Sequence, residues 1–146
     1  MPTSSRFAVA VHVLALLARA GDKPLKSEQV ASSVNTNAVV IRRVLCALAR
    51  AGLVASQTGA SGGTRLARPP REITLREVYR AVEPRVIFAP HRQTPNQKCP
   101  VGMHIEAILQ DVLADVDGAV DTALGQTTIE AVVRAVKPRA ASRGRK

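Results

Sequence analysis

The chain has 146 residues, 46% hydrophobic and 22% charged, which is enough for one domain with a core or a small domain plus a dimerisation element. Its net charge of +10 is uneven, because residues 1–71 carry ten Lys and Arg against two acids, residues 72–136 carry six against nine, and residues 137–146 carry five and no acid. Aromatic residues make up only 2%, which excludes stacking platforms for single-stranded nucleic acid, and two cysteines are too few for a disulfide-stapled secreted scaffold.

Three helices are predicted in the basic first half, the half expected to face a polyanion. They span residues 6–20, 27–34 and 38–51, and the first and third are followed by glycines, Gly21 and Gly52, that favour helix ends. Asn37 or Thr36 is expected to cap the third helix. The first helix is apolar almost all round, which predicts burial on most of its surface.

The third predicted helix has one apolar face and one cationic face. Four residues recur at helical spacing on the apolar face: Ile41, Val44, Leu45 and Leu48. A helix, a short turn and a second amphipathic helix with a polar start and paired arginines are typical of a helix-turn-helix that reads the major groove. The residues expected to contact DNA here are Ser27, Asn37, Val39, Arg42 and Arg43. Cys46 is expected in the core.

A β-hairpin is predicted directly after the third helix. Strands over residues 53–57 and 64–67 flank a glycine-rich tip, whose glycine spacing matches neither the dinucleotide fingerprint nor the phosphate-binding loop. Such a hairpin beside a recognition helix is a wing, and its glycines let the tip approach the sugar-phosphate backbone or a minor groove. The residues expected to contact DNA here are Ser61, Gly62, Gly63, Thr64 and Arg65.

The second half is predicted to contain three helices. Thr74 and Glu77 form a capping box for a helix through Glu83, and a proline-rich loop follows over residues 84–101. The next helix, over residues 102–124, has an apolar stripe that invites a partner helix, although packing within the same chain is an alternative. The stripe residues expected at a dimer interface are Ile105, Ile108, Leu109, Val112, Leu113 and Val116. A short helix to Val136 precedes a basic tail, residues 137–146, expected to be disordered.

Several short motifs of this sequence occur together at characteristic distances. They are RFAV at 6–9, RR at 42–43, AGLV at 51–54, GASGG at 59–63, ITL at 73–75 and VYRAV at 78–82. Together they resemble the Rrf-two family of bacterial winged-helix transcription regulators over roughly residues 4–125. The resemblance implies a homodimer, joined largely through the long helix, that binds a pseudo-palindromic operator with its third helix in the major groove and its wing in the minor groove. Thr64 stands where family members often carry an aromatic residue.

The segment before the long helix has a single thiol, Cys99, between His91 and His104. Family members that hold an iron–sulfur cluster place three cysteines there, and ligation by one thiolate does not suffice, so we expect no cofactor and no cluster. The segment looks like that of the cluster-less subgroup. Cys99 lies just before a helix N-terminus, which favours a reactive sensor thiol; a small-ligand pocket and a buried, inert cysteine are the alternatives.

The expected fold is mainly α with a small β-hairpin wing: a winged helix-turn-helix over 1–83, a loop over 84–101 as effector region and dimerisation helices over 102–136. The sequence predicts a cytoplasmic DNA-binding regulator, acting as a repressor, whose partners are double-stranded DNA, a second copy and a small molecule or oxidant. No catalytic set of residues occurs at convincing spacing, and the apolar run 7–18 is too short to span a membrane. The alternatives are a non-specific architectural DNA binder, and a metal or redox protein that uses His91, Cys99 and His104.

Overall fold

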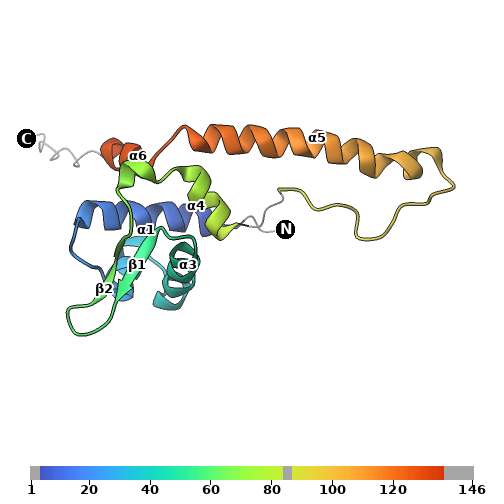
Figure 1. Cartoon of the computed structure of the whole chain (residues 1–146). Coiled ribbons are helices and arrows are strands. Elements are labelled where there is room, and N and C mark those ends of the chain that lie inside the picture. Colours follow the sequence, from blue (N-terminus) through green and yellow to red (C-terminus); the bar gives the residue numbers. More distant parts are fainter. Residues whose placement is uncertain (1–3, 84–86, 137–146) are drawn as a thin grey trace, which may run out of the picture.

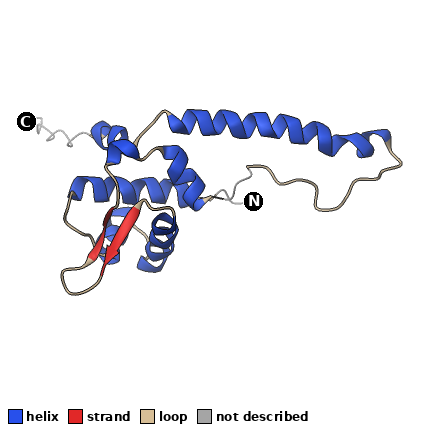
Figure 2. Ribbon diagram, viewed as in Figure 1, coloured by secondary structure: helices blue, strands red, loops and turns tan. Residues whose placement is uncertain are grey.

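The computed structural model describes residues 4–83 and 87–136 and has the expected mainly α fold with one small hairpin (Figures 1 and 2). Its elements are α1 (Arg6–Ala20), α2 (Ser27–Val34), α3 (Ala38–Arg50), β1 (Val54–Gln57), β2 (Gly63–Leu66), the 3-10 helix η1 (Pro70–Glu72), α4 (Leu75–Val82), α5 (Pro100–Gly125) and α6 (Ile129–Ala135). The basic tail predicted for 137–146 and the start of the loop, 84–86, lie outside the described residues.

Helix α1 is the centre of the hydrophobic core. Its buried residues recur at helical spacing: Ala10, Val13, Leu14 and Leu17. Side chains from α3, the β1 entry and α4 complete the core, among them Ile41, Leu48, Leu53 and Val78, each no more than 1% exposed. The predicted burial of the first helix is confirmed, and α1 thereby holds α3 and the hairpin in fixed positions on one body.

Helix α6 also packs against this core, although the sequence analysis assigned it, together with the long helix, to the dimerisation helices. Ile129 is fully buried, and its N–H donates to the carbonyl of Ile73 at 2.9 Å. The N–H of Leu75 donates to the carbonyl of Thr127 at the same distance. The chain therefore returns to α1 after α5, through contacts between residues far apart in sequence. We refer to α1–α4, the hairpin, η1 and α6 as the body.

Two arginines of α4 hold the C-terminal part of α5 against the body. Arg76 Nε donates to the Asp121 carbonyl at 2.9 Å, and Arg80 forms an ion pair with the Asp121 carboxylate. From this anchor the 26-residue helix, about 39 Å long, extends away from the body (Figure 1). It begins at Pro100, two residues earlier than predicted, because proline is well tolerated in the first turn of a helix.

The base of the hairpin is fixed by a third segment of chain. Thr64 N–H donates to the Leu25 carbonyl at 2.8 Å, and Leu25 N–H donates to the Thr64 carbonyl at 2.9 Å. This close approach requires glycine at the neighbouring position, since Gly63 has φ +152° and a Cβ there would lie 2.6 Å from the Leu25 carbonyl oxygen. Gly63 therefore fixes where the wing leaves the body.

We expect Gly63→Ala to lower the free energy of unfolding by about 1–3 kcal/mol, because it adds a steric clash to an unfavourable backbone conformation. Urea unfolding checks this. Gly59→Ala is the matched control: Gly59 also has a positive φ, +101°, but a Cβ there meets nothing within 4 Å. Equal losses in the two variants would show that the Leu25 contact does not matter.

Candidate nucleic-acid interface

Helix α3 presents an exposed, basic surface opposite its buried face. Asn37 caps the helix, with its Oδ1 accepting from the N–H of Val39 at 2.7 Å, so of the two expected caps the structure selects Asn37. Val39 is 49% exposed, and the Arg42 and Arg43 side chains lie in solvent. An exposed first turn with two arginines behind it has the geometry that a recognition helix needs.

Helix α2 contributes a contact that the sequence pattern did not reveal. Glu28, in the first turn of α2, accepts a hydrogen bond at 2.8 Å from Arg42 of α3, and both side chains are exposed, 66% and 55% respectively. Arg43 has no ion pair within the described residues. Ser27 is the first residue of α2 and is partly exposed. The two neighbouring arginines therefore have different surroundings.

The hairpin lies beside α3, on the side of the body away from α5 (Figure 1). Residues 58–61 at its tip are exposed, and so is Arg65, which agrees with a wing that can reach a nucleic acid. Thr64 is only 6% exposed and its backbone is paired with Leu25 at the base of the wing, so its burial does not favour the predicted contact with DNA.

The two glycines at the end of the tip have structural roles of their own. Gly62 is buried, and a Cβ there would lie 2.2 Å from the Gln57 carbonyl oxygen. Gly63 is restricted by Leu25 as described above. Their presence is explained by contacts within the chain, so glycine at these positions is not by itself a sign of contact with DNA.

Cys46 is exposed on α3, which corrects the expectation that it lies in the core. It falls three residues after Arg43 and four after Arg42, so all three occupy one side of the helix. The core face holds Val44, Leu45 and Leu48 instead. Both cysteines of the chain are free and exposed, which matters for any test of thiol chemistry.

An ion pair links the base of the wing to α4. Arg68 donates to Glu77 at 2.8 Å, and the Glu77 carboxylate also completes the capping box with Thr74. Burial alone would raise the pKa of Glu77, but hydrogen bonds from Arg68 and Thr74 and the charges of Arg68 and Arg76 lower it below its ordinary value. The stabilisation is therefore present at neutral pH and is lost as the pH falls through the folded-state pKa.

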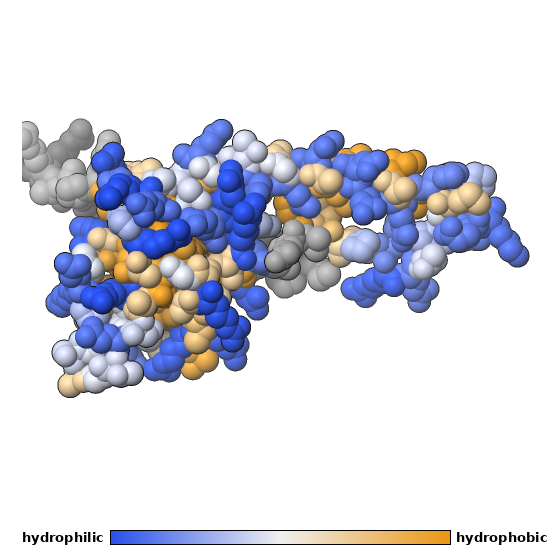
Figure 3. Space-filling view, viewed as in Figure 1, coloured by the Kyte–Doolittle hydropathy of each residue, from blue (hydrophilic) through white to orange (hydrophobic). Residues whose placement is uncertain are grey.

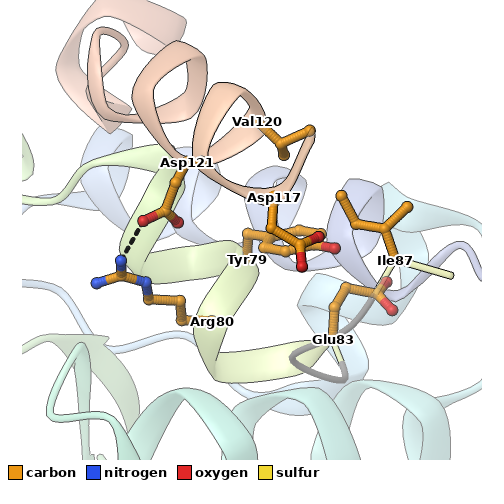
Figure 4. Close-up of a pocket in the computed structure, with 8 residues that line it drawn as sticks. Tyr79, Arg80, Glu83, Ile87, Asp117, Val120 and Asp121 are labelled. Carbon is orange, nitrogen blue, oxygen red and sulfur yellow. Dashed lines mark hydrogen bonds and ion pairs between the residues drawn. The ribbon is translucent and has the colours of Figure 1, made fainter. Parts of the chain in front are cut away.

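A cavity of about 520 Å³ lies where α4 meets α5 (Figure 4). Tyr79 of α4 and Glu83, the residue that ends this helix, face Asp117 of α5 across it, while Asp121 pairs with Arg80 at one end. Burial raises the pKa of Tyr79, and the Glu83 and Asp117 carboxylates raise it further. The cavity thus presents a protonated phenol between two carboxylates, an environment that disfavours anions.

Much of the apolar stripe of α5 is exposed. No residue of this helix is buried, and Ile108 and Val112 are 56% and 52% exposed. Apolar surface is visible on α5 beyond the body in Figure 3. Leu109 and Leu113 line a second cavity, about 780 Å³, with the loop residues Phe88–His91. Ile105, Leu113 and Val116 are half-buried, so the most open part of the stripe is the line through Ile108 and Val112.

The residues of the metal alternative are not brought together. Among residues 4–83 and 87–136 no three His, Cys, Asp or Glu side chains are grouped as a metal site requires, so His91, Cys99 and His104 do not form one. His91 lines the second cavity, and His104 does not. Iron–sulfur clusters are held mainly by several cysteine thiolates, whereas this segment has a single thiolate, Cys99, so the expected absence of a cluster stays a prediction.

Cys99 is the N-cap residue of α5 and is exposed, so the expectation of a buried, inert thiol is wrong. Its N–H donates to the Asn96 carbonyl at 3.2 Å, and a Cβ at Gly102 would lie 2.3 Å from that same carbonyl oxygen. The loop is thus tightly folded against the start of α5.

In the part of the chain that the structure describes, no helix has the length and apolarity to cross a membrane.

Comparisons with known proteins agree with this geometry. The chain matches the model of the family Rrf2, described as "Iron-dependent Transcriptional regulator", over residues 3–135. A Bacillus subtilis (strain 168) protein named "Putative HTH-type transcriptional regulator YwnA" is 40% identical over 131 residues, which cover 89% of this chain and 96% of that protein. A crystal structure of "a putative DNA binding protein" is 36% identical, with a TM-score of 0.71 over 88% of this chain and 98% of the other. T. potens IscR is 21% identical, with a TM-score of 0.70 over 99% and 94%, which supports the fold alone.

Proposed function

The chain belongs to the Rrf2 family of transcriptional regulators, and from this premise we propose that it binds a pseudo-palindromic DNA operator as a homodimer and represses transcription there. The observation that carries the proposal is the exposed basic surface of α3 and of the neighbouring wing, where the Arg42, Arg43 and Arg65 side chains are all exposed. In this arrangement α3 enters the major groove and the wing tip lies along the backbone or in the minor groove.

The proposed homodimer is supported by the open stripe on α5. A helix with no buried residue and large exposed apolar side chains is unusual in a monomer, because such surface is normally covered. Pairing two copies of α5 about a two-fold axis would cover it with the same residues from each chain. Two recognition helices would then face half-sites about one turn of DNA apart, roughly 34–36 Å.

The experiment that tests operator binding is selection of duplexes from a random library by the purified protein. The proposal predicts enrichment of two inverted half-sites. If no sequence is enriched, and the affinity varies with salt concentration but not with the sequence of the duplex, the result favours a non-specific architectural DNA binder.

Control of operator affinity through Cys99 is a second part of the proposal. The thiol is exposed at the start of the helix on which the dimer depends, and its loop is closely folded there. Oxidation by hydrogen peroxide converts the thiol to a sulfenic acid with release of water, and a polar group at this point would disturb the start of α5. A change at the start of the shared helix would alter the spacing of the two recognition helices.

We expect hydrogen peroxide to weaken operator binding by about 5–150-fold in the wild type and in Cys46→Ser, and to leave Cys99→Ser unchanged. The measurement is titration of the selected operator with each protein, reduced and oxidised. Cys46→Ser is the necessary control because Cys46 is exposed on α3. If Cys46→Ser, and not Cys99→Ser, keeps its operator affinity in hydrogen peroxide, the oxidant acts on Cys46 of α3 and the proposal is contradicted.

A further inference from the structure

Glu28 is one of only two acids among the first 71 residues, and it lies on the surface that we assign to DNA. A carboxylate there repels phosphates, so its position is costly for binding to nucleic acid in general. Its ion pair with Arg42 is exposed, and exposed ion pairs add little to the stability of a folded chain. Neither general affinity nor stability therefore explains why this carboxylate contacts Arg42.

An arginine guanidinium has five N–H donors in a planar fork, so it can donate to a carboxylate and to a base at the same time. In the structure one terminal nitrogen, Arg42 Nη2, donates to Glu28 Oε1 at 2.8 Å. Its remaining N–H donors have no partner among residues 4–83 and 87–136, so they can meet the O6 and N7 acceptors of a guanine in the major groove. A negative partner also disfavours rotation of this guanidinium towards a phosphate. Arg43, the next residue, has no such partner within the described residues.

We propose that Glu28 is a positioning residue that holds Arg42 as a reader of guanine and leaves Arg43 to contact phosphate. The inference rests on the proposed operator binding. It goes further by naming the arginine that contacts a base and the residue that holds that arginine in place. When DNA displaces water from this surface, the Glu28–Arg42 contact strengthens because it loses solvent screening. The specificity of the regulator at one base pair in each half-site thus depends on an acidic residue of α2.

The test uses the full-length protein and a duplex selected by the wild type from a random library. Affinities are measured for that duplex and for a set in which each base pair is replaced in turn. We expect Glu28→Ala to reduce discrimination about tenfold at one guanine position per half-site and to leave the other positions unchanged. Asp22→Ala, which removes the other acid of this half, is the matched control and should leave every preference unchanged.

An Arg42→Ala background separates positioning from a merely structural role. If Glu28 acts through Arg42, Glu28→Ala changes no base preference further in that background. The inference is overturned if Glu28→Ala discriminates between base pairs as the wild type does. It is also overturned if Glu28→Ala lowers this discrimination as much in the Arg42→Ala background as in the wild type. If the wild type selects no sequence at all, the proposed function itself fails and the inference falls with it. If the wild type selects a sequence that Glu28→Ala reads equally well, only the inference fails.

Discussion

The double substitution Ile108→Glu and Val112→Glu is expected to convert the protein to a monomer and to weaken operator binding by about 10²–10⁴-fold. These two side chains are the most open part of the α5 stripe, at 56% and 52% exposed, so the substitutions leave the core of the chain intact. In a two-fold dimer each added carboxylate would lie in an apolar interface close to its symmetry mate, without a partner charge. A monomer binds only one half-site. In the dimer, binding of the first half-site raises the effective concentration of the second recognition helix at the other half-site, and the monomer lacks this gain in affinity.

Sedimentation of the wild type and of the double variant, at micromolar concentration, measures this effect. Ala107→Glu is the control, because residue 107 is exposed on the same turns of α5 but lies away from the line through Ile108 and Val112. Circular dichroism establishes that α5 is still helical in each variant. A wild type that sediments as a monomer would exclude the dimer, and so would a double variant that remains dimeric.

Removing the neighbouring arginines of α3, Arg42 and Arg43, is expected to have the second largest effect. Arg42→Ala combined with Arg43→Ala would remove the proposed base contact and the proposed phosphate contact from each half-site, and both side chains are exposed, so folding should be unaffected. Loss of the base contact costs about 1–3 kcal/mol at one position, and loss of the phosphate contact lowers the salt slope by about 1 per half-site. The dimer doubles both losses, which predicts at least a hundredfold weaker operator binding.

The single variants divide this effect in two. Arg42→Ala should relax the preference at one base pair and leave the salt dependence nearly unchanged. Arg43→Ala should weaken all duplexes alike and flatten the salt dependence. Titrations at several salt concentrations distinguish the two patterns. Unchanged operator affinity in the double variant would show that α3 is not the recognition helix.

The elements with strong local signals were predictable from the sequence. Helix ends at Gly21 and Asn37, the capping box of Thr74 and Glu77 and the glycine-rich hairpin each depend on neighbouring residues, and the structure has them where expected within a few residues. The position of α6 was not predictable in this way. Ile129 packs against residues more than 50 positions earlier, and no periodicity within a short helix reveals such a partner.

The candidate site was predictable in its residue types but not in its contacts. The pairing of Glu28 with Arg42 joins two helices, and the backbone of Thr64 is hydrogen-bonded to Leu25, which lies outside the hairpin. Cys46 is flanked by apolar residues in sequence, yet it falls on the exposed side of α3 because the core face of that helix is narrow. Such tertiary contacts decide which members of a basic motif are free to bind.

The central claim, sequence-specific binding of DNA by a dimer, is tested most directly by comparing two affinities of the wild-type protein at physiological salt. One is for the selected duplex, and the other is for a duplex of the same length and composition in scrambled order. We predict a ratio of at least about 10³ and a stoichiometry of two chains per selected duplex. A ratio near one, or saturation by a single chain, would contradict the claim.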